Sequence, residues 1–238
     1  MQFGNNRQTM SQTDARTSQY DVGLRKYMLN VYNYMAAALA LTGIVAMVVV
    51  QSETMMQLIF NTPLKWVVML APLGFVFFLG FRIHKMSASA AQMTFWAFAA
   101  VMGLSLSSIF AIYTGTSIAR TFFITAVAFG ALSLYGYTTK RDLSAFGSFL
   151  IMGVVGLFLA SIVNIFLQST MMHMVISAVG VLLFAGLTAY DTQKIKDIYN
   201  ELDSSEVAGK KAIMGALNLY LDFINMFMFL LQFLGDRR

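Results

Sequence analysis

The sequence contains no cysteine among its 238 residues, which excludes disulfides and thiolate metal sites. Charge is also scarce: 11% of the residues are charged and 58% are hydrophobic, whereas soluble domains have roughly 25% charged residues. This composition is typical of an integral membrane protein. The net charge of +5 does not indicate nucleic-acid binding, because the basic residues lie in short segments between long apolar runs.

The apolar runs predict an all-α, polytopic membrane protein in the lipid bilayer. A helix needs roughly 20 mostly apolar residues to cross a ~30 Å hydrocarbon core, and seven segments meet this length. The fourth is the weakest because Arg120 lies near its start, so a six-helix protein is the alternative. The predicted spans are residues 28–50, 64–83, 89–113, 117–139, 146–167, 171–195 and 211–234.

The remaining residues predict the domain organisation and the orientation. Residues 1–26 are polar and lack the apolar core of a cleavable signal peptide, so we expect a cytoplasmic tail followed by a membrane domain at 27–238. If the seven spans alternate in direction, 12 of the 16 Lys and Arg residues fall on the side of the N-terminus. The positive-inside tendency then places the N-terminus in the cytoplasm and the C-terminus outside.

Two carboxylates stand out within the spans. Asp222 lies in LYLDFINMFMFLLQFLG and Asp191 in GLTAYDTQKIK. A charged carboxylate in the middle of a spanning helix costs about 2.5–3.5 kcal/mol on insertion scales, so such residues usually face the bundle interior and a partner. If the two helices form a hairpin that turns near residues 203–209, both aspartates are about 12 to 13 residues from the turn and at nearly the same level.

Polar and small residues follow each aspartate at helical spacing. Asn218 and Asn225 share a stripe with Asp222, and Thr188 shares one with Asp191. We call these two stripes the polar seam, and expect them to face each other. The other members of the seam are Gly215 and Gln232 on the last span and Ser177 and Gly180 on the sixth.

The chemistry expected of this pair is proton and cation binding. Two carboxylates within hydrogen-bond reach cannot both ionise cheaply, so they share a proton and titrate as a coupled pair. When both are ionised, their oxygens and nearby amide oxygens suit a hard cation such as calcium. The alternative is a structural clasp between two helices that moves no ion. Nothing in the sequence indicates an organic cofactor.

Arg82 is a further candidate, at the end of the second span in the segment LGFRIHKM. A basic residue in this place either orients the helix in the bilayer or reaches the aspartates and neutralises them.

The segments LTAYDTQKIK, ALNLYLDFINMFMFLLQFLG and KRDLSAFGSFL resemble those of the Bax inhibitor-1 family, and the resemblance extends from about residue 25 to the end of the chain. Within that family the sequence looks like a bacterial member, which implies the inner membrane. The resemblance implies seven helices with the last in the middle, and a pH-dependent calcium leak. It assigns the pH sensor and the calcium site to Asp191 and Asp222, and a latch on this pair to Arg82.

Other functions are weighed against this one. Intramembrane aspartyl proteases also place aspartates in two consecutive spans, but they need Gly-x-Gly-Asp, and Asp222 follows Leu-Tyr-Leu. A retinal protein needs a lysine deep in its last span, and none occurs after Lys211. We therefore expect no enzyme. The main alternative is a non-transporting regulator that binds a membrane protein partner; some relatives suppress cell death or modulate a membrane protease.

Overall fold

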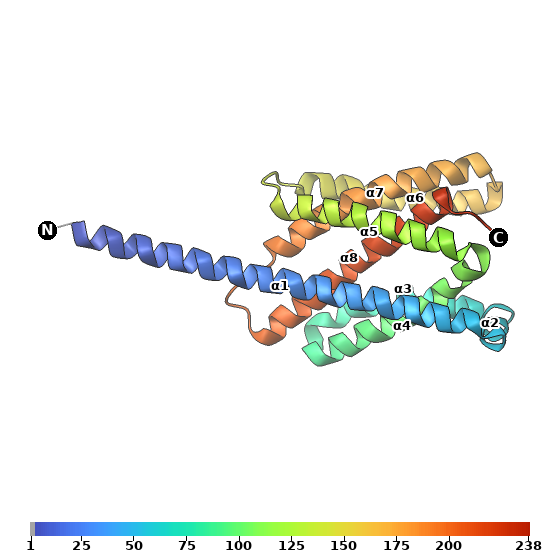
Figure 1. Ribbon diagram of the computed structural model, residues 1–238, viewed down its shortest axis with the longest axis horizontal. Helices are drawn as coiled ribbons and strands as arrows, with labels where there is room; N and C mark the ends of the chain where they lie inside the picture. Colours follow the sequence, from blue (N-terminus) through green and yellow to red (C-terminus); the bar gives the residue numbers. More distant parts are fainter. Residues whose placement is uncertain (1–2) are drawn as a thin grey trace.

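The computed structural model describes residues 3–238, with side chains from residue 20 onward, and every regular element in this part of the chain is helical (Figure 1). The elements are α1 (Phe3–Gln51), α2 (Glu53–Phe60), α3 (Leu64–Arg82), η1 (Ile83–Lys85), α4 (Ala88–Ile112), α5 (Gly115–Thr138), α6 (Ser144–Leu167), α7 (Thr170–Asp197) and α8 (Ser205–Leu234).

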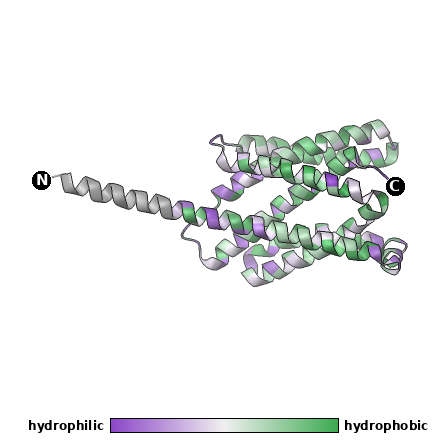
Figure 2. Cartoon of the chain, viewed as in Figure 1, coloured by the Kyte–Doolittle hydropathy of each residue, from purple (hydrophilic) through white to green (hydrophobic). Residues whose placement is uncertain are grey.

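Seven of these helices are long and apolar enough to cross a membrane, as the sequence predicts. They are α1 from Tyr20 onward and α3, α4, α5, α6, α7 and α8. The weakest prediction, the fourth span, is confirmed as α5, so the six-helix alternative is wrong. Many large hydrophobic side chains of these helices are exposed. Along the ribbon the helices are mostly hydrophobic, and hydrophilic residues occur mainly towards the two ends of the bundle (Figure 2).

Hydroxyl side chains fix the starts of the helices. The first residues of a helix leave backbone N–H groups without intrahelical partners, and a Ser or Thr oxygen just before the helix accepts from one of them. The N-cap residues that do this are Ser52 for α2, Ser87 for α4, Thr114 for α5, Ser169 for α7 and Ser204 for α8.

The helices form two groups that α8 joins. One group contains α1, α3 and α4, and the other contains α5, α6 and α7; within each group the neighbouring helices pack along their lengths. Helix α8 packs against members of both, namely α1, α4, α5 and α7 (Figure 1). In the most apolar 18-residue stretch of α8, 61% of the residues are buried, whereas the corresponding stretches of the other six spanning helices are 11–33% buried. The prediction that the last helix is central is confirmed.

The basic turns gather at one end of the bundle. Lys210 Nζ donates to the Met86 carbonyl at 3.2 Å, which links the start of α8 to the α3–α4 turn. Gln193 Nε2 donates to the Arg141 carbonyl at 2.8 Å, which adds the α5–α6 turn. We call this end, where the membrane part of α1 begins, the basic end. The turns rich in Lys and Arg thus lie on one side of the bundle, as the count of basic residues requires. That this end faces the cytoplasm stays a prediction.

The opposite end of the bundle holds the C-terminal segment. The Thr114 N–H donates to the Asp236 carbonyl at 3.1 Å, and the Arg238 N–H donates to the Ile112 carbonyl at 2.9 Å. The Asp236 carboxylate accepts from Ser117 Oγ at 3.0 Å. These contacts tie the residues after α8 to the turn between α4 and α5, so both ends of α8 are anchored.

The boundary expected at residue 26 has no counterpart in the backbone. Helix α1 runs without a break from Phe3 to Gln51, and its side chains are buried against the bundle from Leu24 onward. The polar character predicted for the tail concerns mostly side chains before residue 20, which lie outside the described part of the chain.

The turn before α8 lies earlier than the sequence predicts. We expected it at residues 203–209, but α7 ends at Asp197 and α8 begins at Ser205. The reason is local: Ser204 accepts from the Val207 N–H, and Asp203 pairs with Lys211 one to two turns into α8. Residues 205–209 therefore belong to the helix.

Close packing between α5 and α7 gives a test of the fold. Gly136 lies so near the Ala189 backbone that a Cβ there overlaps its carbonyl oxygen, whereas a Cβ at Gly130, on the same helix, meets nothing within 4 Å. We expect Gly136→Ala to lower the free energy of unfolding by about 1–3 kcal/mol, because the backbones must separate. Gly130→Ala is the matched control. Thermal unfolding in detergent measures both, and equal melting temperatures contradict the packing.

Candidate functional site

Asp222 lies in the interior of the bundle on the central helix α8. Its side chain is 4% exposed, between Leu219 and Phe223, which are buried too. Its Oδ2 atom has no hydrogen-bond partner among the described residues. A buried polar atom without a partner is costly and therefore rare in folded proteins. Asp222 thus differs from an ordinary structural aspartate, whose oxygens accept hydrogen bonds.

Asp191 lies on α7, which packs along α8, and its side chain is half-buried. The two carboxyl groups are near enough for the charge of Asp191 to act on Asp222. The Asp222 Oδ2 atom forms no hydrogen bond with Asp191. The structure therefore brings together the two aspartates that the sequence isolates, in electrostatic contact.

The register of α7 and α8 shows how the two aspartates are offset. Gly215 packs against Ile195 near the basic end, and Ser177 donates to Gln232 Oε1 at 3.2 Å near the opposite end. Continuing this antiparallel pairing puts Asp222 opposite Thr188 and Asp191 opposite Leu219, about 4.5 Å apart along the axis. The prediction of nearly equal depth is wrong by about one helical turn, because the α7–α8 turn falls earlier than expected.

Arg82 was the predicted cation for this pair, and the structure adds Lys194. Lys194 lies one turn from Asp191, and its charge acts on that carboxyl from the exposed side of α7. Arg82 ends α3 with an exposed side chain and forms no ion pair with any carboxylate among residues 20–238. The latch assigned to Arg82 is not formed in this structure.

The polar seam is present, but its members make fewer contacts across the helices than its spacing suggests. Asn225 Nδ2 donates to the Leu221 carbonyl at 2.8 Å, and Thr188 Oγ1 donates to the Phe184 carbonyl at 2.8 Å, each within its own helix. Asn218 is half-buried on α8. The Thr188 hydroxyl oxygen and the Asn225 Oδ1 atom both remain able to accept a hydrogen bond.

Aromatic rings close the seam between Asp222 and the opposite end. Phe229 of α8 packs onto Gly180 of α7, where a Cβ comes within 2.6 Å of the ring. The same ring stacks on Phe184, with centroids 5.9 Å apart. Beyond them lies a polar cavity of about 460 Å³ whose lining includes His173, Gln232 and Arg237. The Phe184–Phe229 pair therefore separates this cavity from the carboxyls.

Hydrogen bonds fix how α8 is rotated. Thr42 Oγ1 of α1 donates to the Ala99 carbonyl of α4 at 2.9 Å, so at 2.7 Å it accepts from the Tyr220 hydroxyl of α8. Residues two apart on a helix point in nearly opposite directions. Anchoring Tyr220 towards α1 and α4 thus directs Asp222 towards α7. Sequence reasoning missed this contact, because a single Thr in an apolar span has no spacing that reveals its partner.

A second hydroxyl chain, also missed, runs beside the seam. Thr192 Oγ1 donates to the Thr188 carbonyl at 2.7 Å and accepts from Ser133 Oγ of α5 at 2.9 Å. Ser133 in turn accepts from the Tyr32 hydroxyl of α1 at 2.5 Å. The chain connects three helices and ends on a backbone carbonyl, so it orients α7 without reaching either carboxyl. The polar residues of α5 are its only signal in the sequence.

A metal ion at the pair needs further ligands. No three His, Cys, Asp or Glu side chains gather anywhere in the described part of the chain. Calcium binds roughly six to eight oxygen atoms. The two aspartates of the pair supply only some of these, so amides, backbone carbonyls and water must supply the others. The residues present fit a weak, partly hydrated cation better than a tightly held structural ion.

Known proteins resemble this chain over nearly its whole length. Residues 24–238 match the family described as inhibitor of apoptosis-promoting Bax1. Protein RP147 of Rickettsia prowazekii is 50% identical over 228 residues, which cover 95% of this chain and 96% of that protein. The Escherichia coli (strain K12) inner membrane protein YbhL is 47% identical over 219 residues, 91% of this chain and 94% of the relative. A Caulobacter vibrioides protein is 46% identical over 228 residues, covering 92% and 91%.

The contact that orients α8 can be tested directly. Thr42→Val keeps the shape of the side chain but removes its hydrogen bonds to the Ala99 carbonyl and the Tyr220 hydroxyl, and the buried Tyr220 hydroxyl loses this partner. We expect a loss of about 1–3 kcal/mol in unfolding free energy. Thr116→Val, at an exposed position of α5, is the control. If both variants melt at the temperature of the unsubstituted protein in detergent, the buried hydrogen bonds do not hold α8.

Proposed function

Since the chain belongs to the Bax inhibitor-1 family, we propose that this polytopic membrane protein is a pH-sensitive cation leak channel, with calcium as its ion. The observation that carries the proposal is the Asp222 carboxyl, which lies buried on the central helix with one oxygen unpartnered and a second aspartate beside it. Ionisable groups inside a membrane domain mark ion and proton pathways more often than they serve stability.

The pair responds to pH because protons and cations compete for the same oxygens. When the carboxyls share a proton, the seam holds less negative charge and binds a divalent cation weakly. When both are ionised, they attract the cation and repel each other, which favours separation of α7 from α8. Conduction also requires a site that releases its ion. A site with only two carboxylates among roughly six to eight oxygen ligands binds calcium weakly enough for release.

The pathway runs along the polar seam. From the opposite-end cavity an ion must pass Ser177 and Gln232, then the Phe184–Phe229 pair, before it reaches Asp222. Apolar rings at a constriction obstruct ions by excluding water. The arrangement described above is thus a closed state, in which the aromatic pair forms the barrier on one side of the carboxyls.

We further propose that the protein lies in the bacterial inner membrane, with its basic end in the cytoplasm. The name of the Escherichia coli relative supports the first part, since it is an inner membrane protein. The positive-inside tendency supports the second, because the turns rich in Lys and Arg gather at that end.

Calcium flux into dye-loaded liposomes that contain only the purified protein tests the proposal. From about pH 5 to about pH 8 we expect flux to rise with pH, because ionisation of the pair admits the cation. Asp191→Asn and Asp222→Asn should each flatten this dependence, whereas Asp142→Asn, in the exposed α5–α6 turn, should retain it.

Flux equal to that of empty liposomes overturns the proposal, and makes the pair a clasp in a non-transporting regulator that acts on a membrane protein partner. Flux whose pH dependence survives both aspartate substitutions assigns the sensor to other groups.

The aromatic barrier gives a second prediction. Phe229→Ala removes the ring that packs on Gly180 and Phe184, and we expect it to raise calcium flux about two- to tenfold, as estimated from the worth of an aromatic pair. Phe158→Ala, at an exposed position of α6 away from this cavity, is the control. A Phe229→Ala protein that folds normally and leaks no faster than the control contradicts a barrier at this level.

A further inference from the structure

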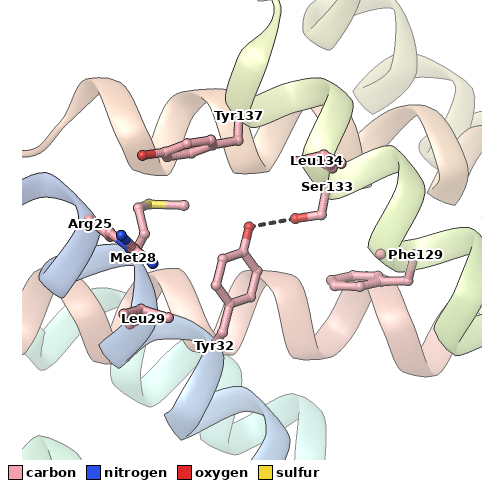
Figure 3. A pocket seen from close by; sticks show the side chains of 9 residues that line it. Arg25, Met28, Leu29, Tyr32, Phe129, Ser133, Leu134 and Tyr137 are labelled. Atoms are coloured by element: carbon pink, nitrogen blue, oxygen red, sulfur yellow. Dashed lines mark hydrogen bonds between the residues drawn. The ribbon is translucent and has the colours of Figure 1, made fainter. Parts of the chain in front are cut away.

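A cavity of about 450 Å³ lies between α1 and α5 near the basic end (Figure 3). It exists because α8 is the main connection between the two helix groups: α1 and α5 each pack on α8 but make no extensive contact with each other. Tyr32 and Ser133 both line the cavity, and their hydroxyl oxygens are hydrogen-bonded at 2.5 Å across the side that faces the interior of the bundle. The cavity is therefore a lateral one in the wall of the bundle, separate from the aspartate pair.

The lining of this cavity is polar at one end and apolar at the other. The Arg25 guanidinium and the Tyr137 hydroxyl lie on one side, and Phe129 lies on the other (Figure 3). Lys196 adds charge at the polar side, because its Nζ donates to the Tyr137 carbonyl at 3.0 Å. No carboxylate among residues 20–238 pairs with Arg25. Asp21, one turn earlier on α1, is exposed and adjoins this end.

The apolar side continues deeper into the membrane. A second cavity of about 740 Å³ between the same two helices shares Phe129 with the first and is lined almost entirely by apolar side chains, among them Met35 and Phe223. From Arg25 to Met35 the helix rises about 15 Å, which is half of the ~30 Å hydrocarbon core. The groove thus matches the depth of one leaflet.

We propose that this groove binds an anionic phospholipid from the leaflet at the basic end. Its phosphate lies against Arg25 and the Tyr137 hydroxyl, and an acyl chain runs past Phe129 towards the second cavity. The guanidinium forms paired hydrogen bonds with phosphate oxygens, and its charge favours a headgroup whose net charge is negative. The bound lipid fills the gap between the two helix groups and holds them at a fixed separation.

Electron spin resonance of spin-labelled lipids in vesicles containing the full protein tests the headgroup selectivity. We expect labelled phosphatidylglycerol to be immobilised about fivefold more strongly than labelled phosphatidylcholine, the selectivity that one basic residue provides near a membrane surface. Arg25→Gln should remove this preference. Lys26→Gln, a neighbouring exposed cation that does not line the cavity, should keep it. Equal binding of the two lipids by the unsubstituted protein, or equal losses in the two variants, overturns the proposal.

Filling the groove tests the location independently of charge. Gly130 lines the cavity, and a Cβ there meets nothing within 4 Å, so the Gly130→Phe variant adds a ring where the backbone leaves room for a side chain. We expect it to reduce the immobilised phosphatidylglycerol, while Gly156→Phe, at an equally open glycine on α6, leaves it unchanged. Unchanged immobilisation in a folded Gly130→Phe protein places the lipid elsewhere and refutes this site.

Discussion

The architecture depends on the need to enclose a polar helix within hydrocarbon. Helix α8 carries Asp222, Asn225 and Gln232, and lipid offers such groups no hydrogen bonds. The solution is to surround α8 with α1, α4, α5 and α7, whose outer surfaces then take the contact with lipid. Helix α6 shows the other extreme: only 11% of its most apolar window is buried, and it needs no polar partner.

The contacts of α8 are unequal on its two sides. Towards α1 and α4 it is held by the buried Tyr220–Thr42 hydrogen bond and by close packing of the Tyr220 ring on Phe98, at 5.2 Å between centroids. Towards α7 the polar contact across the seam is Ser177–Gln232, and the other contacts are apolar, among them the Phe184–Phe229 stack and Gly215 against Ile195. A motion that opens the seam breaks these contacts with α7 if α5, α6 and α7 move as one body against α8, α1 and α4. Such a rigid-body shift is an ordinary way for a packed bundle to change state.

Much of this structure could be predicted from the sequence, and the errors have physical causes. Uninterrupted apolar runs predict the seven spans, because length and hydropathy alone decide whether a helix crosses a membrane. The cost of burying charge picks out Asp191 and Asp222 without any knowledge of packing. The position of the α7–α8 turn was wrong because Ser204 ends the loop with a hydrogen bond that hydropathy does not register. The Thr42 and Ser133 contacts join distant helices, and no local pattern encodes their partners. The latch at Arg82 was predicted only from the family resemblance, and in this structure the Arg82 side chain is exposed and forms no latch.

The central place of α8 also constrains how the protein is made. Helix α8 follows in the chain the six spanning helices around it, so these enter the bilayer before their common core is synthesised. Until then the two groups lack the element that joins them, and the polar face of α7, with Ser177 and Asp191, has no partner on α8. During translation such a half-built bundle is a substrate for chaperones and for quality-control proteases. The insertion of α8 is thus the step that joins the two groups of three spanning helices into a single bundle.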